Sequence, residues 1–305
     1  MATKPAKKTP PAAKAAKSAN AAAKPQAREQ GRRQALVTGA TSGIGQAAAV
    51  GLAQAGFDVT ILVRDHGRGE AARQAILAKA PGARVDLLGG DLESQGSVRK
   101  AAAEFLKTAP ELHVLVNCAG VFLPDREVTE DGVERTLAIN YVGGYLLTEL
   151  LLPALKRGAP SRIVTVASRY GKARIDFEDL QLERRKFSYM TAVPASKLAQ
   201  VLWTQDLAER LDGTGITANA VHPGLVAKTK LLDETGGFFR WMTNRVGGTP
   251  EKGADTVVWL ATAPEVAGET GGLWEKRKRR PTPGQGSEPE ARRRLREETE
   301  KLVAR

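Results

Sequence analysis

The chain has 305 residues, of which 42% are hydrophobic, and a formal net charge of +12. This length accommodates one α/β domain of about 240 to 270 residues with a tail at each end. The single cysteine excludes an internal disulfide framework and is typical of a reducing cytosol. No apolar run of about 18 residues and no signal-peptide pattern occurs, so we expect a cytoplasmic protein without a membrane span.

The positive charge is concentrated at the two ends of the chain. Residues 1–33 carry nine Lys or Arg and one Glu, and residues 275–305 carry eleven and six. Apart from Met1, the first segment has no aliphatic side chain larger than alanine, so we expect it to be disordered. Its two interpretations are a solvated leader and a loose tether for phosphates. We expect no specific nucleic-acid partner, because the body between the ends is nearly neutral.

From residue 34 onward, short aliphatic and β-branched runs alternate with amphipathic segments. This alternation is typical of βαβ units, so we expect a single Rossmann-type doubly wound parallel sheet, an α/β fold. The expected strands span residues 34–39, 58–64, 84–90, 113–120, 161–168 and 216–224, with a weakly signalled seventh near 271–274. The expected helices span residues 46–56, 68–80, 97–108, 136–157 and 196–211.

Three regions follow from this pattern: a disordered tail at 1–33, a nucleotide-binding domain at 34–274 and a basic extension with a short helix at 275–305. Within the extension, the run Lys276–Arg280 (KRKRR) predicts a solvated turn.

A glycine-rich loop lies between the first expected strand and the first expected helix. Glycine allows a sharp turn and close approach of the backbone to a pyrophosphate, whose charge the amides at the helix N-terminus favour. Such a loop is specific evidence for a dinucleotide because it lies inside a repeating α/β pattern. The loop residues expected to bind the cofactor are Gly39, Thr41, Ser42, Gly43, Ile44 and Gly45.

The end of the second expected strand predicts which dinucleotide binds. Arg64 comes first after the strand, and a guanidinium suits the 2′-phosphate of NADP(H). The alternative is that Arg64 is a solvated loop residue and Asp65 binds the ribose hydroxyls of NAD. We predict NADP(H).

These motifs, in this order, resemble the short-chain dehydrogenase/reductase family, in particular its retinol dehydrogenase-like branch, over nearly all of residues 34–304. Besides TGATSGIG, the matching segments are GDLESQGSVR, NCAG, PASKLAQ and HPG. The resemblance implies an NADP(H)-dependent oxidoreductase whose cofactor also contacts Asp91, Leu92, Asn117, Ala119, Gly120, Lys197, Pro223 and Gly224.

The resemblance also implies three residues for the chemistry. Ser168 corresponds to the serine that donates a hydrogen bond to the substrate oxygen. Lys197 corresponds to the lysine that binds the nicotinamide ribose, and Asn140 to an asparagine that organises a proton-relay water. The family's tyrosine, four residues before the lysine, is replaced here by Val193. Because that tyrosine transfers the proton in the family mechanism, its absence puts ordinary turnover in question.

Three tyrosines lie near enough in sequence to be considered as substitutes: Tyr141, Tyr170 and Tyr189. On a continuous helix Tyr189 would lie about 12 Å of rise from Lys197, too far for contact. Pro194 disfavours helical geometry at the preceding residue, so a loop that folds back is the alternative for Tyr189. Tyr170 follows Ser168 by two residues and can reach the same pocket. The competing interpretation for all three is a pocket-wall or surface side chain.

Two hypotheses therefore stay open. The first is an NADP(H)-dependent oxidoreductase acting on a carbonyl or a primary or secondary alcohol, with the proton coming from water or from a relocated tyrosine. The second is a cofactor-binding pseudoenzyme or a non-redox catalyst. Residues 231–248 contain Phe238, Phe239, Trp241 and Met242, which suggest an apolar lid over a lipophilic small-molecule substrate. Packing onto the body or onto a second subunit of a homo-oligomer is the alternative.

Overall fold

The computed structural model describes residues 31–226, 247–282 and 284–304. The tail expected to be disordered therefore lies, up to residue 30, outside the described residues. The expected lid at 231–248 also falls outside them, except for Gly247 and Gly248.

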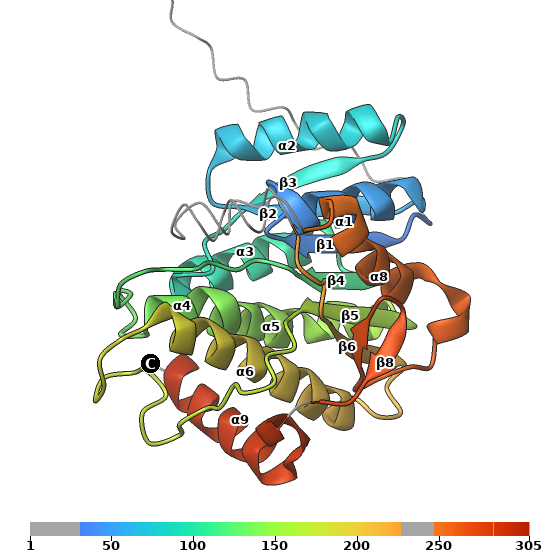
Figure 1. Cartoon of the computed structure of the whole chain (residues 1–305). Coiled ribbons are helices and arrows are strands. Elements are labelled where there is room, and N and C mark those ends of the chain that lie inside the picture. The colour runs from blue at the N-terminus through green and yellow to red at the C-terminus, as the bar shows by residue number, and fades with distance from the viewer. Residues whose placement is uncertain (1–30, 227–246, 283, 305) are drawn as a thin grey trace, which may run out of the picture. The chain divides into compact units, whose positions relative to one another are not determined.

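Within the described residues, eight strands form one sheet in the order β3-β2-β1-β4-β5-β6-β7-β8 (Figure 1). The pairs from β3 to β7 are parallel, and only β7 and β8 are antiparallel. The predicted Rossmann-type doubly wound sheet is confirmed, including the weakly signalled seventh strand. The strands are β1 (Gln34–Thr38), β2 (Asp58–Val63), β3 (Val85–Gly89), β4 (Val114–Asn117), β5 (Ser161–Val166), β6 (Ile216–Val221), β7 (Leu273–Glu275) and β8 (Lys278–Arg280).

The basic run Lys276–Arg280 is only partly a turn, so its interpretation as a solvated turn is wrong for residues 278–280. Lys276 and Arg277 have positive φ angles of 51° and 56° and connect the two strands of the β7–β8 hairpin. The Arg277 amide donates to Thr256 Oγ1 at 3.1 Å, which helps to hold this turn. Strand β8 then forms the edge of the sheet, where charged side chains discourage pairing with another chain. The boundary expected at residue 274 falls within β7.

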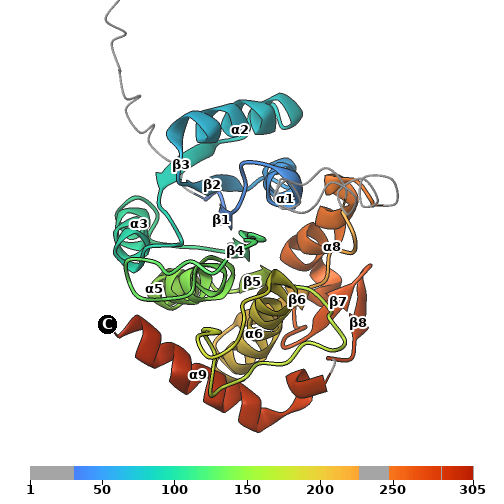
Figure 2. The same cartoon turned by 60° about the vertical axis from the view of Figure 1, so that its left-hand side comes forward.

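Helices cover both faces of the sheet (Figure 2). Along β1, Leu36 packs into the core cluster with residues of α3, α5 and α6, whereas Ala35 and Val37 pack into the cluster with residues of α1, α2 and α8. This alternation follows from the two-residue period of a strand. The helices are α1 (Gly43–Gln54), α2 (His66–Lys79), α3 (Gln95–Thr108), α4 (Arg135–Leu137), η1 (Ala138–Val142), α5 (Gly143–Arg157), α6 (Tyr189–Arg210), α8 (Pro250–Thr262), η3 (Pro264–Val266), η4 (Gly284–Ser287) and α9 (Pro289–Val303).

Helix α8 is absent from the helices predicted above, although the parallel pair β6–β7 requires a crossover between its strands. Its start follows the ordinary rules: Thr249 caps the helix by accepting a hydrogen bond from the Lys252 amide, and Pro250 occupies the first position. Helix α8 packs closely on α1, since a Cβ on Gly51 would lie 2.6 Å from Val258 Cγ2.

Among the described residues, one helical stretch, 135–157, is long and apolar enough to cross a membrane by length and composition. However, 78% of its apolar window is buried inside the domain. Leu137, Leu147 and Leu151 belong to the core cluster beneath α3 and α6. The apolar side chains of this stretch therefore pack in the core of the domain.

The C-terminal extension contains the 15-residue helix α9, which packs on α6. Arg296 of α9 pairs with Asp206 of α6 at 2.9 Å. The buried Tyr141 hydroxyl lies 2.8 Å from Thr299 Oγ1. Because the Thr299 hydroxyl itself donates to the Leu295 carbonyl, Tyr141 is the donor of this bond.

Replacing Thr299 by valine should lower the free energy of unfolding by about 1 to 3 kcal/mol, because the buried Tyr141 hydroxyl loses its acceptor. Chemical denaturation measures the loss. In the double variant with Tyr141→Phe, most of the stability should return, since both polar partners are then removed. An additive loss in the double variant would contradict the importance of this hydrogen bond.

Candidate active site

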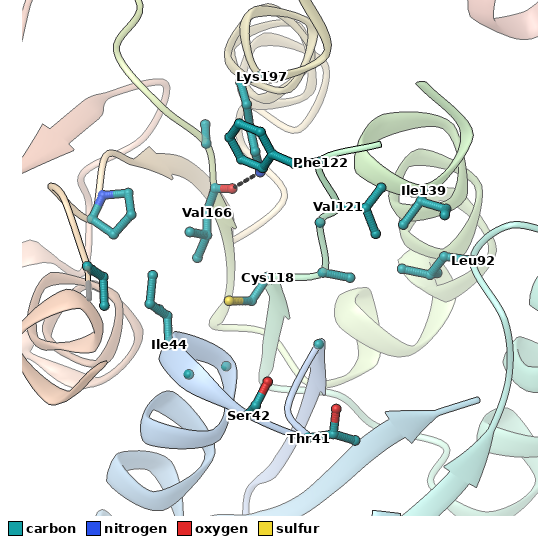
Figure 3. A pocket seen from close by; sticks show the side chains of 18 of the residues that line it. Thr41, Ser42, Ile44, Leu92, Cys118, Val121, Phe122, Ile139, Val166 and Lys197 are labelled. Carbon is teal, nitrogen blue, oxygen red and sulfur yellow. Dashed lines mark hydrogen bonds between the residues drawn. The ribbon is translucent and has the colours of Figure 1, made fainter. Parts of the chain in front are cut away.

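A cleft of about 910 Å³ opens at the carboxyl ends of the parallel strands (Figure 3). Its walls include residues that directly follow β1, β2, β3, β5 and β6, such as Gly39, Arg64, Gly90, Ala167 and His222. All of the predicted site residues line it except Asn117 and Asn140. In Figure 3, Thr41, Ser42 and Ile44 lie on the opposite side of the cavity from Lys197 and Phe122. This edge of the sheet is where open α/β folds bind ligands.

The glycine loop has the backbone geometry that the sequence requires. Gly39 and Gly43 have φ angles of 67° and 57°, a region that side chains other than glycine rarely adopt. A Cβ on Gly45 would lie 2.3 Å from the Gly39 carbonyl oxygen, so no larger residue fits between α1 and the loop. Helix α1 begins at Gly43, and Ser42 before it makes no side-chain capping bond. The free amides at this helix start fit a pyrophosphate.

At the β2 end of the cleft, Arg64 and Asp65 have different environments. The Asp65 carboxylate caps α2 by accepting a hydrogen bond from the Arg68 amide at 2.7 Å. The Arg64 side chain is 59% exposed and lies 3.8 Å from the carboxylates of Asp91 and Glu93. Arg68, which sequence reasoning missed, also lines the cleft. Its position in the first turn of α2 is the signal that could have found it.

The turn after β4 is held by a residue that sequence reasoning also missed. Thr38 Oγ1 accepts hydrogen bonds from the amides of Cys118 and Ala119 at 3.0 and 3.2 Å. Asn117 lies behind the cleft, where its side-chain amide donates to Thr148 Oγ1 of α5 at 3.0 Å. Thr38 thus joins the ends of β1 and β4, and Asn117 joins β4 to α5. A hydroxyl at the end of the first strand was the available signal for Thr38.

Asn140 lies in the short π-helical segment η1, a geometry that often marks functional sites. Its side chain accepts from the Val121 amide at 2.7 Å and donates to the Val121 carbonyl at 3.2 Å and to Ser196 Oγ at 3.0 Å. Asn140 therefore fastens the loop after β4 to α6, beside the cleft. Its expected role in organising a water stays a prediction.

Lys197 projects into the cleft from α6 and is 7% exposed. Its Nζ donates to the Val166 carbonyl at 3.0 Å, as Figure 3 shows. Burial lowers the pKa of Lys197 to about 8, and burial raises the pKa of the neighbouring Cys118 thiol to about 12. The thiol is thus a poor candidate for a nucleophile.

Helix α6 decides two questions about the missing tyrosine. Val193 is fully buried, is absent from the walls of the cleft and lies one turn before Lys197. The helix already begins at Tyr189, so the alternative that Pro194 leaves this segment as a loop is wrong. Pro194 is the sixth residue of the helix and lies inside it, and the helix start is capped by Ser188 accepting from the Met190 amide. Tyr189 consequently stays eight positions from Lys197 and away from the cleft walls.

The other two tyrosines, Tyr141 and Tyr170, lie in different environments. Tyr141 is buried with its hydroxyl on Thr299, so it is directed at the C-terminal helix. Tyr170 lines the cleft near Ser168, and burial raises the pKa of its phenol while the Ser168 hydroxyl lowers it to a smaller extent. Of the three candidates, only Tyr170 has its phenol beside a residue expected to carry chemistry.

Comparisons with known proteins agree with this geometry. The family profile described as short chain dehydrogenase matches residues 33–236. Retinol dehydrogenase 13 of Homo sapiens is 36% identical over 280 residues, covering 88% of this chain and 83% of that protein. Polyprenol dehydrogenase of Mus musculus is 41% identical over 250 residues, covering 78% and 74%.

Solved structures that superpose on this chain also include a short chain dehydrogenase. An uncharacterized protein of Mycobacterium paratuberculosis superposes with a TM-score of 0.73 at 29% identity, covering 89% of this chain and 93% of the other. A short chain dehydrogenase of Burkholderia cenocepacia J2315 in complex with NADP superposes with a TM-score of 0.64 at 29% identity, covering 80% and 95%. The chain belongs to the short chain dehydrogenase family, in its retinol dehydrogenase-like branch.

Proposed function

We propose that this protein is an NADP(H)-dependent oxidoreductase that interconverts a lipophilic carbonyl compound and its alcohol. The proposal rests on one observation: residues suited to binding a dinucleotide and residues suited to orienting a substrate oxygen line the same cleft. The glycine loop and Arg64 line one part of it, and Ser168 and Lys197 line another. A dinucleotide bound along the strand ends would thus lie beside groups able to orient a substrate oxygen.

The residues present fit this cofactor. The open backbone at Gly39 and Gly45 would receive the pyrophosphate, Arg64 and Arg68 the 2′-phosphate, and Lys197 the nicotinamide ribose. When bound, the nicotinamide would supply or accept the hydride of the redox step. Ser168 would hold the substrate oxygen by donating a hydrogen bond, while burial of the site excludes water from Lys197.

The substrate class is inferred from the walls near Lys197. Val121, Phe122 and Leu225 contribute apolar surface to the cleft. The names of the relatives, retinol dehydrogenase and polyprenol dehydrogenase, support a lipophilic alcohol or aldehyde. Cytoplasmic location, a homo-oligomeric state and the lack of a specific nucleic-acid partner stay predictions from the sequence.

NADPH should bind more tightly than NADH, and Arg64→Ala should narrow the difference by about 1 to 3 kcal/mol, because a charge-assisted pair with the 2′-phosphate is lost. Calorimetric titration of both cofactors into both proteins measures this. Arg99→Ala, a change at an arginine of α3 that does not line the cleft, is the control and should leave both affinities unchanged. Equal affinity for NADH and NADPH in the unmutated protein would end the NADP(H) assignment.

The redox reaction itself is tested by following NADPH oxidation with a panel of lipophilic aldehydes and ketones. The competing hypothesis, a cofactor-binding pseudoenzyme or non-redox catalyst, is favoured by the replacement of the family's tyrosine by Val193. Tight NADPH binding without oxidation against any member of the panel would support that hypothesis.

A further inference from the structure

Reduction of a carbonyl requires a proton on the oxygen as well as a hydride on the carbon. With valine at the position that corresponds to the family's tyrosine, this proton has to come from another group in the cleft or from water. Away from the Arg64 end, the described walls of the cleft contain five side chains that carry an ionisable group: Cys118, Arg169, Tyr170, Lys197 and His222.

Four of these groups are poorly suited. The Cys118 thiol is a weak hydrogen-bond donor, and a guanidinium such as Arg169 does not give up its proton in proteins. Lys197 already donates to the Val166 carbonyl. Burial lowers the pKa of His222, which favours the neutral imidazole. Among the described residues, however, His222 Nδ1 has no hydrogen-bond partner, so His222 is the competitor that a test has to address.

Tyr170 has the chemistry and the position. It lines the same cleft as Ser168, two residues further along the segment that follows β5. The Ser168 hydroxyl is near enough to lower the pKa of its phenol, although burial, the larger cause, raises that pKa. An oxygen held by Ser168 would therefore lie close to the phenol. Tyr170 is 38% exposed, so part of its side chain contacts solvent.

We propose that Tyr170, in the segment that follows β5, is the proton donor of this enzyme and replaces the family's tyrosine, whose position in α6 is occupied by Val193. The inference rests on the proposed function. In the step, the Tyr170 O–H bond breaks and an O–H bond forms on the substrate oxygen. The carbonyl π pair moves onto that oxygen as the carbon accepts the hydride from the nicotinamide. The carbonyl would thus be reduced to the alcohol, with bound NADPH as the two-electron reductant, and the Tyr170 phenolate would then take a proton from water.

The first test is Tyr170→Phe in the full chain, which removes one oxygen and keeps the ring. Turnover of the best carbonyl in the panel should fall by about 10²- to 10⁴-fold, the range for general acid catalysis. NADPH affinity should stay unchanged. Tyr189→Phe is the matched control, because Tyr189 is similarly exposed but does not line the cleft, and its turnover should equal that of the unmutated protein. Unchanged turnover in Tyr170→Phe overturns the proposal, and a larger loss in His222→Gln than in Tyr170→Phe assigns the donor to His222.

The second test does not depend on turnover. The chain has four tyrosines, and burial raises the pKa of Tyr141, Tyr145 and Tyr170. Because Tyr170→Phe removes one of these phenols, the difference in tyrosinate absorbance between the unmutated protein and this variant isolates the titration of Tyr170. Addition of NADP⁺ should lower the pKa of Tyr170 by about 1 to 3 units, because the oxidised nicotinamide is positively charged.

These results separate the two proposals. If the protein binds NADPH and reduces no carbonyl, the proposed function fails, and the titration alone decides whether Tyr170 lies beside the nicotinamide. A Tyr170 titration that NADP⁺ does not shift overturns the assignment of Tyr170, even where turnover is found.

Discussion

Replacing Lys197 by methionine should lower reductase turnover by at least about 100-fold, because the cofactor and substrate lose a group that orients them. The same change should make the cofactor-free protein more stable at pH 7. Lys197 is 7% exposed, and burial lowers its pKa to about 8. Methionine has a similar length and no charge to desolvate, so function and stability should respond in opposite directions.

The pH dependence of stability follows from the direction of this pKa shift. Between the folded-state pKa of about 8 and the ordinary lysine pKa of 10.5, the unfolded chain binds more protons at Lys197 than the folded protein does. Stability should therefore rise with pH across this window, and the destabilising contribution is fully present below pH 8. In Lys197→Met this part of the rise should disappear.

Thermal unfolding of the cofactor-free protein across this pH range measures the effect, and NADPH oxidation measures the loss of turnover. Lys107→Met, at an exposed lysine of α3, is the control and should change neither quantity. If Lys197→Met destabilises the cofactor-free protein at pH 7, the hydrogen bond to the Val166 carbonyl outweighs the cost of burying the charge.

The sequence predicted those parts of the cleft that depend on local backbone chemistry. A glycine that must adopt positive φ, as at Gly39, or leave room for a neighbouring carbonyl, as at Gly45, is recognised from its place between a strand and a helix. The strand ends were predicted for the same reason, and Arg64 and Ser168 line the cleft because each follows a parallel strand.

The parts that depend on contacts between distant segments were less predictable. Asn140 is bound by Val121 and Ser196, which lie 19 and 56 positions away, so its contacts could not be read from its neighbours in sequence. The edge strand β8 consists of three basic residues, whose composition favours solvent, and only pairing with β7 gives it a strand geometry. The continuity of α6 through Pro194 could likewise not be predicted from the local sequence, in which a proline disfavours helical geometry at the preceding residue.

Restoring the family's tyrosine should affect turnover differently in the unmutated protein and in the Tyr170→Phe variant. Val193 lies four residues before Lys197, so a tyrosine there would project from the same face of α6. If Tyr170 already supplies the proton, Val193→Tyr in the unmutated protein should give no gain in turnover. In the Tyr170→Phe background, the same change should restore turnover by about 10²- to 10⁴-fold.

The change also has a packing cost, since Val193 is fully buried and a phenol needs more room than two methyl groups. Overpacking of this kind typically costs about 1 to 3 kcal/mol. Val193→Phe is the matched control, because it adds the ring without the hydroxyl and should show the cost in stability but no recovery of turnover.

Turnover and chemical denaturation of five proteins therefore form one experiment: the unmutated protein, Tyr170→Phe, Val193→Tyr, the double variant of these two changes, and the control that combines Tyr170→Phe with Val193→Phe. Recovery in the double variant but not in Tyr170→Phe with Val193→Phe would show that a phenol at either position serves the same oxygen. A rise of about 100-fold in Val193→Tyr alone would mean that the unmutated enzyme lacks an effective donor. The protein would then be a weakened reductase, and Tyr170 would line the cleft without acting as the proton donor.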